Sequence, residues 1–526
     1  MIKTDEKAKK CRKEILKMKK FKRNICLALA VLLTVSLLAS CGSKVSNSPG
    51  KPVTLTWVMS GSEQSDAKMV WEKFNEELNK KEGFENYKID FKLIPFSDFG
   101  QKFMLMQTSG EKMDIVSTYN AGLGERARDG TYLDLTDMME EFAPDILKEI
   151  PEWALDLCKV DGRQFAITNY QQMSEAKYGT ALQADEADKY FDFDALKKAQ
   201  ASSPKLNQAI YDVYEDYLDK LKANGELHLG MYPGTTWMMM KGYDYVVNYL
   251  WVFEREGDDV KVEHIMETDT YQLMMKNADK FFKKGFIRKD VLSADLGKEK
   301  GLPNGYDIWQ EMCFKGAEDS HSLQYGMDVR LVEPEKDFYI SNKASAGGNA
   351  ILAATEFPEE ALKFLNLMNT EQGKDLYRLL VYGIEGKHYN MVEGSDIRIE
   401  PIGYVGNPGA ADAPYGLNKW IVGNCALAFE APTEPEGWLD YVFNDWNVNA
   451  KPSKIAGFVL DTESVDVEFS QIRAVTSEYR DVLVSGALED YQATYKEAMK
   501  KLEIAGLSKV KAEIQKQVDE FLAKKK

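Results

Sequence analysis

The sequence predicts an α/β protein, and three observations lead to this prediction. Between Val53 and Ser117, β-rich runs alternate with amphipathic helical segments. Residues 471–526 have an entirely helical pattern. The chain has 526 residues, which is enough for two or three domains with separate cores. Such alternation is typical of a parallel sheet with helices on both faces.

A leader precedes the alternating part. A lysine-rich stretch is followed by an apolar run from Ile25 to Ser40, which ends in Leu38-Ala39-Ser40-Cys41. These are the parts of a secretory signal peptide, and an uncleaved N-terminal anchor helix is the alternative. The final residues also resemble a bacterial lipobox, so we expect Cys41 to carry lipid. Residues 1–40 are then the signal peptide, with Met18 as an alternative start, and residues 41–52 form a flexible tether.

The folded part begins with three strands and two helices. The pattern predicts strands over Val53–Ser60, Tyr87–Ile94 and Asp114–Ser117, and helices over Ser65–Lys80 and from Asp98 to Ser109. In parallel sheets, ligands bind beyond the carboxyl ends of the strands. This places three segments at one rim: Ser60–Glu63, Pro95–Ser97 and Thr118–Asn120.

Later segments carry turn and helix-end signals. Asp161-Gly162 predicts a hairpin over Val160–Ile167, and Tyr243–Phe253 with Val260–Met266 predicts a second one. Gly285 is a predicted C-cap for a helix over Thr270–Lys284, and Pro358 begins another helix. Three helices are predicted in the C-terminal region, with Gly506 between the last two.

Charge and composition exclude some classes of protein. The net charge is −17, and removal of residues 1–40, which carry +8, leaves −25. This argues against nucleic-acid binding, which requires clustered Lys and Arg. We expect Cys158, Cys313 and Cys425 to be buried and unpaired. The four histidines are not at metal-ligand spacing, so neither a metal nor another cofactor is expected.

Four stretches resemble family 1 extracellular solute-binding lipoproteins of ABC importers, in the branch with the DUF3502 C-terminal region. The most specific is Leu380-Val381-Tyr382-Gly383-Ile384-Glu385-Gly386-Lys387-His388-Tyr389, which is similar to the branch's YGIEGKHY string. The others are Gly162–Ile167, which is similar to the family's hairpin, the helix Phe357–Thr370, and the C-terminal stretches Gly423-Asn424, Ser453–Val459, Ala505–Leu507 and Gln515–Asp519. Thr168 and Asn169 depart from the family's pattern, which has a proline after the hairpin.

The resemblance implies a two-lobed periplasmic-binding-protein-like fold of type II, with a multi-strand hinge and a helical C-terminus. It implies capture of a sugar or oligosaccharide between the lobes and delivery to membrane permease subunits, by a monomer anchored on the extracellular face of a Gram-positive cell. The expected organisation is 53–168 and 345–385 for the first lobe, 169–344 and 386–470 for the second, and 471–526 for the C-terminal helices.

Sugar binding needs aromatic faces for stacking and polar groups for hydroxyls. Trp237 lies in a loop broken by Pro233 and Gly234, where it either stacks on ligand or fills the core. The other candidates lie at the rim, at the first crossover or after a loop, and each has a purely structural alternative: Tyr119, Asn120, Tyr170, Gln171, Trp309 and Glu63.

Other functional classes remain as alternatives. Gly383–Lys387 has the wrong glycine spacing for a phosphate loop, so nucleotide binding is excluded. Glu385, Lys387 and His388 are expected mainly to brace a turn near the crossing between the lobes. A lipid-anchored glycoside hydrolase would need two carboxylates ~5–10 Å apart, and acidic residues are abundant. A lipid-anchored adaptor or sensor without transport is the third class. The preferred hypothesis has no catalysis.

Overall fold

The computed structural model describes residues 51–118, 122–174, 177–232, 241–247, 250–294, 296–299, 301–333, 339–340, 347–404 and 413–525. The expected signal peptide, the lipidation residue Cys41 and most of the tether lie outside these ranges. None of the helices in the described ranges combines the length and apolar character that a bilayer-spanning helix requires.

The first lobe is built on a five-stranded sheet. Its strands, in spatial order, are β2 (Tyr87–Ile94), β1 (Val53–Ser60), β3 (Ile115–Ser117), β14 (Gly348–Ile351) and β6 (Ile167–Thr168). The predicted strands β1, β2 and β3 are confirmed and run parallel. Strand β14 is antiparallel to both neighbours, so the parallel arrangement predicted from β1, β2 and β3 does not extend to the whole sheet. The reason is topological: the chain returns to this sheet from the second lobe and enters at the opposite end.

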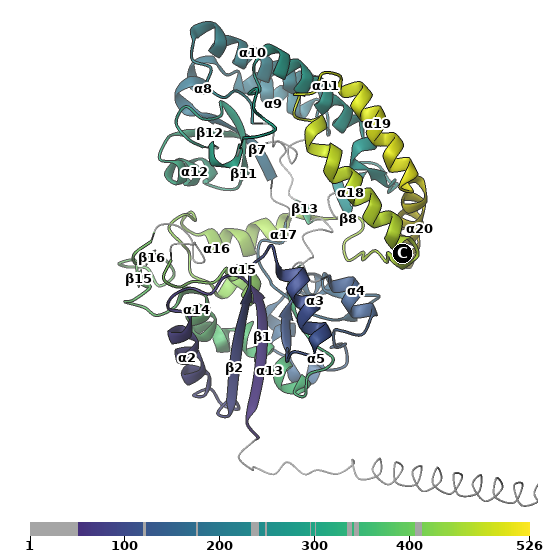
Figure 1. Ribbon diagram of the computed structural model, residues 1–526. Coiled ribbons are helices and arrows are strands. Elements are labelled where there is room, and N and C mark those ends of the chain that lie inside the picture. The colour runs from purple at the N-terminus through teal and green to yellow at the C-terminus, as the bar shows by residue number, and fades with distance from the viewer. Residues whose placement is uncertain are drawn as a thin grey trace, which may run out of the picture. The chain divides into compact units, whose positions relative to one another are not determined.

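Helices cover both faces of this sheet, as predicted. Leu55 and Trp57 of β1 pack with Phe74 of α2 (Ala67–Leu78), whereas the alternate residue Val58 packs with Phe103 of α3 (Phe99–Ser109). Figure 1 shows these two helices on opposite sides of β1 and β2. The period-2 alternation of β1 therefore decides which side chains meet which helix.

The remaining elements of the first lobe are short helices and hairpins. The predicted Asp161-Gly162 hairpin is confirmed, and both residues have positive φ, at 51° and 82°. These elements are α4 (Leu123–Arg128), α5 (Met139–Phe142), α6 (Ile146–Glu149), α7 (Glu152–Asp156), β4 (Lys159–Val160), β5 (Arg163–Gln164), α13 (Pro358–Met368), η5 (Glu371–Gly373), α14 (Lys374–Tyr382), β15 (Tyr389–Met391), β16 (Ile399–Pro401), α15 (Lys419–Val422), η6 (Cys425–Leu427), α16 (Trp438–Asp440), the π-helical turn η7 (Tyr441–Trp446) and α17 (Asn447–Asn449).

The second lobe contains two three-stranded sheets and a layer of helices. The sheet order is β11-β7-β12 in one and β10-β9-β8 in the other. The elements are β7 (Lys177–Gln183), α8 (Ala184–Tyr190), α9 (Phe193–Ala201), α10 (Gln208–Asn224), β8 (Tyr243–Val247), β9 (Trp251–Glu254), β10 (Glu263–His264), η2 (Ile265–Glu267), α11 (Asp269–Lys284), η3 (Leu296–Glu299), β11 (Ile308–Cys313), α12 (Ala317–Tyr325) and β12 (Val329–Val332).

Two predictions in this lobe have different outcomes. Gly285 ends α11 in the left-handed region with φ 76°, as expected. The segment Tyr243–Phe253 is not one strand of a hairpin: it folds back on itself as β8 and β9, and β9 then pairs with β10.

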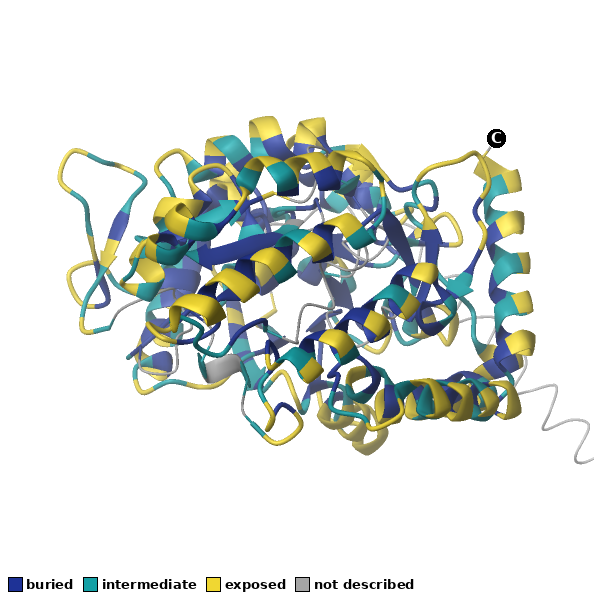
Figure 2. Cartoon of the chain, turned by 90° about the horizontal axis from the view of Figure 1, so that it is seen from above, coloured by how far each residue is buried: buried dark blue, intermediate teal, exposed yellow. Residues whose placement is uncertain are grey.

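The C-terminal helices are part of the second lobe's core. They are η8 (Glu463–Val465), α18 (Asp466–Leu483), α19 (Tyr491–Ile504) and α20 (Leu507–Lys525). Ile472 and Ile514 pack in the same cluster as Trp251. Buried and exposed residues alternate along the helix that ends at the C-terminus in Figure 2. The three predicted helices are confirmed, but residues 471–526 are not a separate layer.

The expected boundary between the lobes differs from the packing. Residues 386–470 were expected in the second lobe, yet Tyr389, Leu417 and Phe429 belong to the cluster of β1 and α2 in the first lobe. The change of core comes only after Ala450, because Ile455 and Phe458 already pack in the second core. Apolar periodicity identifies a buried face but does not say which of two cores covers it.

The chain passes between the two cores three times: between β6 and β7, between β12 and β14, and between α17 and η8. The second and third crossings pair as short parallel strands, β13 (Tyr339–Ile340) and β17 (Lys451–Pro452). Ser453 N also donates to the Ile340 carbonyl at 2.8 Å. The lobes are therefore joined by a multi-strand hinge.

A small aromatic cluster contains side chains from both lobes. Phe314 and Ala317 of the second lobe are buried with Val442 and Trp446 of the first. Phe314 meets Trp438 edge-on at 5.0 Å between ring centroids. We call these residues the interlobe cluster.

Candidate functional site

Strand β1, the carboxyl end of β3 and the start of the first crossing meet at one buried amide. Asn349, on β14, pairs with Ser117 at the end of β3 and is 1% exposed. Its Oδ1 accepts from Trp57 Nε1 at 3.0 Å, and its Nδ2 donates to Asn169 Oδ1 at 2.9 Å. The same amide donates to two carbonyls of α15, those of Ile421 and Val422, at 3.2 Å each. One side chain thus joins the sheet, the first crossing and α15. We call this region the rim.

Three polar atoms at the rim lack a hydrogen-bond partner among the described residues. They are Ser60 Oγ at the end of β1, Ser117 Oγ at the end of β3, and Asn169 Nδ2. All three side chains are almost fully buried. Buried polar groups are nearly always paired with protein or with ordered water. These groups are therefore suited to hold water or the hydroxyl groups of a ligand.

The first crossing is fixed to the first lobe through its backbone. Cys425 N donates to the Tyr170 carbonyl at 2.7 Å, and Asn447 Nδ2 donates to the Gln171 carbonyl at 2.7 Å. Asn447 Oδ1 accepts from Met173 N at 2.8 Å. The crossing therefore starts from a rigid attachment next to the π-helical turn η7.

Tyr170 and Gln171 have different environments. The Tyr170 ring is buried against Phe443, at 5.0 Å between centroids, and burial raises the pKa of its hydroxyl. Its side chain contributes to packing. Gln171 is half-buried, and its Nε2 lies 3.9 Å from the position that a Cβ on Gly347 would occupy. The Gln171 side-chain amide is therefore placed at the rim.

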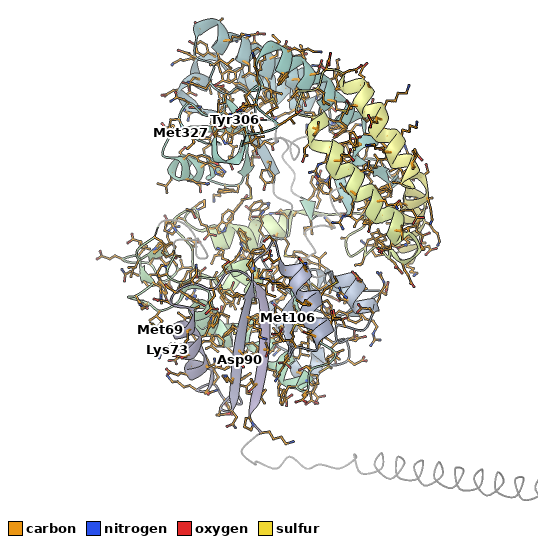
Figure 3. The ribbon with its side chains drawn as sticks, viewed as in Figure 1. Met69, Lys73, Asp90, Met106, Tyr306 and Met327 are labelled. Atoms are coloured by element: carbon orange, nitrogen blue, oxygen red, sulfur yellow. The ribbon has the colours of Figure 1, made fainter. Side chains whose placement is uncertain are left out.

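The other predicted site residues differ in how far they are buried. Glu63 is exposed in the loop that follows β1. Trp309 is fully buried with Ala181, Tyr306 and Val329, so its side chain follows the structural alternative and fills the core of the second lobe. Figure 3 shows Tyr306 and Met327 of this cluster close together in the second lobe. Tyr119, Asn120 and Trp237 lie outside the described residues.

The Lys387-His388 pair braces the first lobe. Asp66, just before α2, contacts Lys387 Nζ at 2.9 Å and His388 Nε2 at 3.2 Å. Ile384 N donates to His388 Nδ1 at 2.8 Å, so Nε2 carries the proton and donates to Asp66. These two bonds to Asp66, above all that from Lys387, lower its pKa. The prediction that Lys387 and His388 brace a turn is confirmed.

Cys158, Cys313 and Cys425 are buried and unpaired, as predicted. Within the described ranges, no three His, Cys, Asp or Glu side chains are grouped as a metal site would need.

Comparison with known proteins identifies the architecture. Residues 454–523 match a family model described as a domain of unknown function, DUF3502. This confirms the resemblance of the C-terminal region. The N-glycan transport solute binding protein (NgtS) from Streptococcus pneumoniae superposes with a TM-score of 0.73 at 22% identity, covering 90% of this chain and 100% of that one.

The chain has the fold of a solute-binding protein. A second structure of NgtS, in complex with Man5GlcNAc, gives a TM-score of 0.65 at 23% identity, over 90% of this chain and 99% of that chain. By sequence, the chain is 25% identical to a carbohydrate ABC transporter substrate-binding protein of Streptococcus pneumoniae serotype 4, over 97% of this chain and 100% of the relative. The predicted two-lobed α/β solute-binding fold is confirmed.

Sequence reasoning missed several rim residues. Asn349 was not singled out, and Ser117 and Asn169 were noted only as a strand end and as a departure from a motif. Ser60 was placed at the rim by the rule for parallel strands, and Ser117 could have been found in the same way, because it is a polar residue that ends a predicted parallel strand. Asn349 carried no such signal, because its strand belongs to this sheet only through a long-range return of the chain.

Proposed function

We propose that this protein is the substrate-binding lipoprotein of an ABC importer, which captures a sugar or oligosaccharide between its two lobes. The observation that carries the proposal is the set of unpaired polar atoms of Ser60, Ser117 and Asn169 at the rim. Ser60 and Ser117 end parallel strands of the sheet, and Asn169 begins the first crossing. Ligands of open α/β sheets bind beyond the carboxyl ends of such strands. Hydroxyl-rich ligands supply the missing partners.

The hinge and the relatives support transport rather than catalysis. Three crossings allow the lobes to close on a ligand that contacts both of them. The relative of 25% identity is named for carbohydrate import, and NgtS has been crystallised with a glycan. In this proposal the protein acts as a monomer, binds its ligand without chemical change and delivers it to permease subunits.

The leader supports a lipid anchor on the extracellular face. Cleavage before Cys41 would leave a cysteine that carries lipid, and two acyl chains are sufficient for stable membrane anchoring. The measurement is metabolic labelling with an alkyne analogue of palmitate. We expect label on the wild-type chain and none on Cys41→Ala, and label on both chains would exclude this site.

The functional test is a thermal-shift and calorimetry screen of the full-length chain in detergent against a glycan panel that includes Man5GlcNAc. A ligand at 100 times its Kd should stabilise the fold by ~2.7 kcal/mol. The bound sugar should be recovered intact. Cleavage products would favour the glycoside hydrolase, and the absence of any glycan-dependent shift would favour the adaptor.

A further inference from the structure

Gly347, which precedes β14, is a glycine that neither backbone conformation nor close packing requires. Its φ lies outside the left-handed region that favours glycine. Apart from its chain neighbours, no atom of the described residues lies nearer than 3.9 Å to the position of a Cβ on Gly347, which is ordinary van der Waals contact. At further glycines with such φ values, a Cβ would come within 2.6 Å of another atom: Gly124, Gly179, Gly305, Gly348, Gly373 and Gly423. The fold therefore leaves room beside Gly347 that it does not leave beside these glycines.

Two side-chain amides lie beside this open position. Asn169 Nδ2 and Gln171 Nε2 are each 3.9 Å from the place where the Cβ of Gly347 would be. The backbone holds these residues together, because Asn169 N donates to the Gly347 carbonyl at 3.0 Å. The Gln171 carbonyl accepts from Asn447 Nδ2 at 2.7 Å, which fixes the other end of the pair to the first lobe. Both amides therefore converge on one point of the rim.

The orientation of the Asn169 amide is fixed by a chain of hydrogen bonds that begins at Trp57. An indole N–H only donates, so the atom of Asn349 that lies 3.0 Å from Trp57 Nε1 is the acceptor Oδ1. Nδ2 of Asn349 then contacts Asn169 at 2.9 Å, and the Asn169 atom that accepts this bond is Oδ1. Asn169 Nδ2 is therefore the atom beside Gly347. Asn169 is 1% exposed, and its Nδ2 has no partner among the described residues, so it requires an acceptor.

Gln171 is the adaptable member of the pair. Its side chain is half-buried and makes no hydrogen bond within the described part of the chain. No neighbouring group therefore fixes the direction of its amide. Rotation of this side chain gives a ligand access to Asn169 Nδ2, which is enclosed in the present arrangement.

We propose that the open position beside Gly347 is a subsite for a sugar oxygen that accepts hydrogen bonds from Asn169 and Gln171. The inference rests on the proposed function and specifies how that site holds its ligand. Asn169 Nδ2 is a donor whose direction is set before the ligand binds, which lowers the entropic cost of binding. The missing side chain of Gly347 supplies the space. Hydroxyl, ring and carbonyl oxygens can accept these bonds, whereas an ammonium group only donates and does not fit.

Calorimetry and thermal unfolding of the full-length chain in detergent test the space beside Gly347, with Man5GlcNAc as the probe. Gly347→Ala should weaken binding at least about tenfold, which corresponds to ~1.4 kcal/mol, because the added methyl group takes up this space. Its unfolding midpoint should stay nearly unchanged, because both the φ and the contact distances admit alanine. Gly348→Ala is the contrast. Its Cβ would lie 2.6 Å from the Ile167 carbonyl oxygen, so this change should lower the unfolding midpoint.

The two amides are tested in the same way. Asn169→Asp keeps an acceptor for Asn349 Nδ2 but replaces Asn169 Nδ2 with an oxygen that cannot donate, so binding should weaken at least about tenfold. Gln171→Ala should weaken it less, by about threefold, because the bond from Asn169 remains. Gln172→Ala is the matched control and should bind as the wild type does, because the Gln172 amide donates to the Ser174 carbonyl at 3.4 Å.

Three outcomes overturn the subsite. The first is unchanged affinity in Gly347→Ala or in Asn169→Asp. The second is a fall in the unfolding midpoint of Gly347→Ala as large as that of Gly348→Ala, because the position beside Gly347 is then not open. The third is a wild-type chain that does not bind Man5GlcNAc, whereas the proposed function fails only if the whole glycan panel is negative.

Discussion

Asn349 Nδ2 donates to Asn169 Oδ1 at 2.9 Å, although 180 residues separate them in the chain. Asn349 lies on the strand that returns from the second lobe, and Asn169 begins the segment that leaves for it. The contact therefore links the first and second crossings inside the first lobe.

Replacement of Asn349 should destabilise the fold. Asn349→Ala removes the partners of Trp57 Nε1 and of the Ile421 and Val422 carbonyls, and leaves these buried groups unsatisfied. Each such group costs about 1–3 kcal/mol, so we expect a loss of about 2–4 kcal/mol in the free energy of unfolding. Urea denaturation measures it. The exposed Asn444→Ala is the control, and an equal, small effect of both changes would contradict this assignment.

Ser117→Ala should lower the affinity for ligand without lowering the free energy of unfolding. Its hydroxyl is buried without a partner in the described part of the chain, so its removal should leave the free energy of unfolding unchanged or slightly higher. If a ligand hydroxyl uses this group, affinity should fall by about five- to tenfold, or about 1–1.4 kcal/mol. Thr118→Ala provides the contrast, because Thr118 Oγ1 accepts from Gly348 N at 3.0 Å and its loss should lower stability. If Ser117→Ala keeps full affinity, this hydroxyl does not contact the ligand.

His264 should make stability depend on pH. It joins β10 to α18 through Thr476 Oγ1, at 3.1 Å from Nε2, and burial lowers its pKa to about 4. Because its pKa in the unfolded chain is about 6.5, the unfolded state binds more protons between these values. Stability should therefore be constant above pH ~6.5 and fall as the pH drops toward ~4, by an amount on the order of 3 kcal/mol. Urea denaturation at several pH values should show a smaller fall for His264→Gln; parallel curves would refute the assignment.

The interlobe cluster should contribute to stability. Phe314 is 9% exposed and packs with Trp438 and His321, so Phe314→Ala leaves a cavity between the lobes. Such truncations cost about 3–5 kcal/mol in full cores, and we expect about 2–4 kcal/mol here because the site is at the edge of both cores. Calorimetric unfolding measures it. Ser320→Ala, which removes one hydrogen bond to the Thr433 carbonyl, is the milder control. If Phe314→Ala changes the free energy of unfolding by less than about 1 kcal/mol, the interlobe cluster contributes little to stability.

Local patterns predicted individual elements closely. The predicted bounds of β1 and β2 are those of the structure, and the Asp161-Gly162 turn, the Gly285 cap and the Pro358 helix start are also confirmed. These features depend on neighbours within a few residues, through backbone conformation and side-chain alternation. Local patterns could not predict the order of strands beyond β3, because β14 joins the sheet only after the chain has formed most of the second lobe.

The candidate site was only partly accessible from the sequence. The position of the rim followed from the rule for parallel strands, and Gln171 lies there. Trp309 was assigned by its residue type and its preceding loop, and the structure instead packs it against Tyr306 and Val329. Residue type alone does not separate an aromatic side chain that binds a ligand from one that fills a core.

The sequence by itself determined the α/β class, most early elements, the predicted leader and the resemblance to solute-binding proteins. Only the tertiary structure decided that residues 389–450 pack on the first core, that the C-terminal helices complete the second, and that Asn349 joins the rim to α15. The physical reason is that secondary structure follows local periodicity, whereas the choice of packing partner depends on contacts between residues hundreds of positions apart.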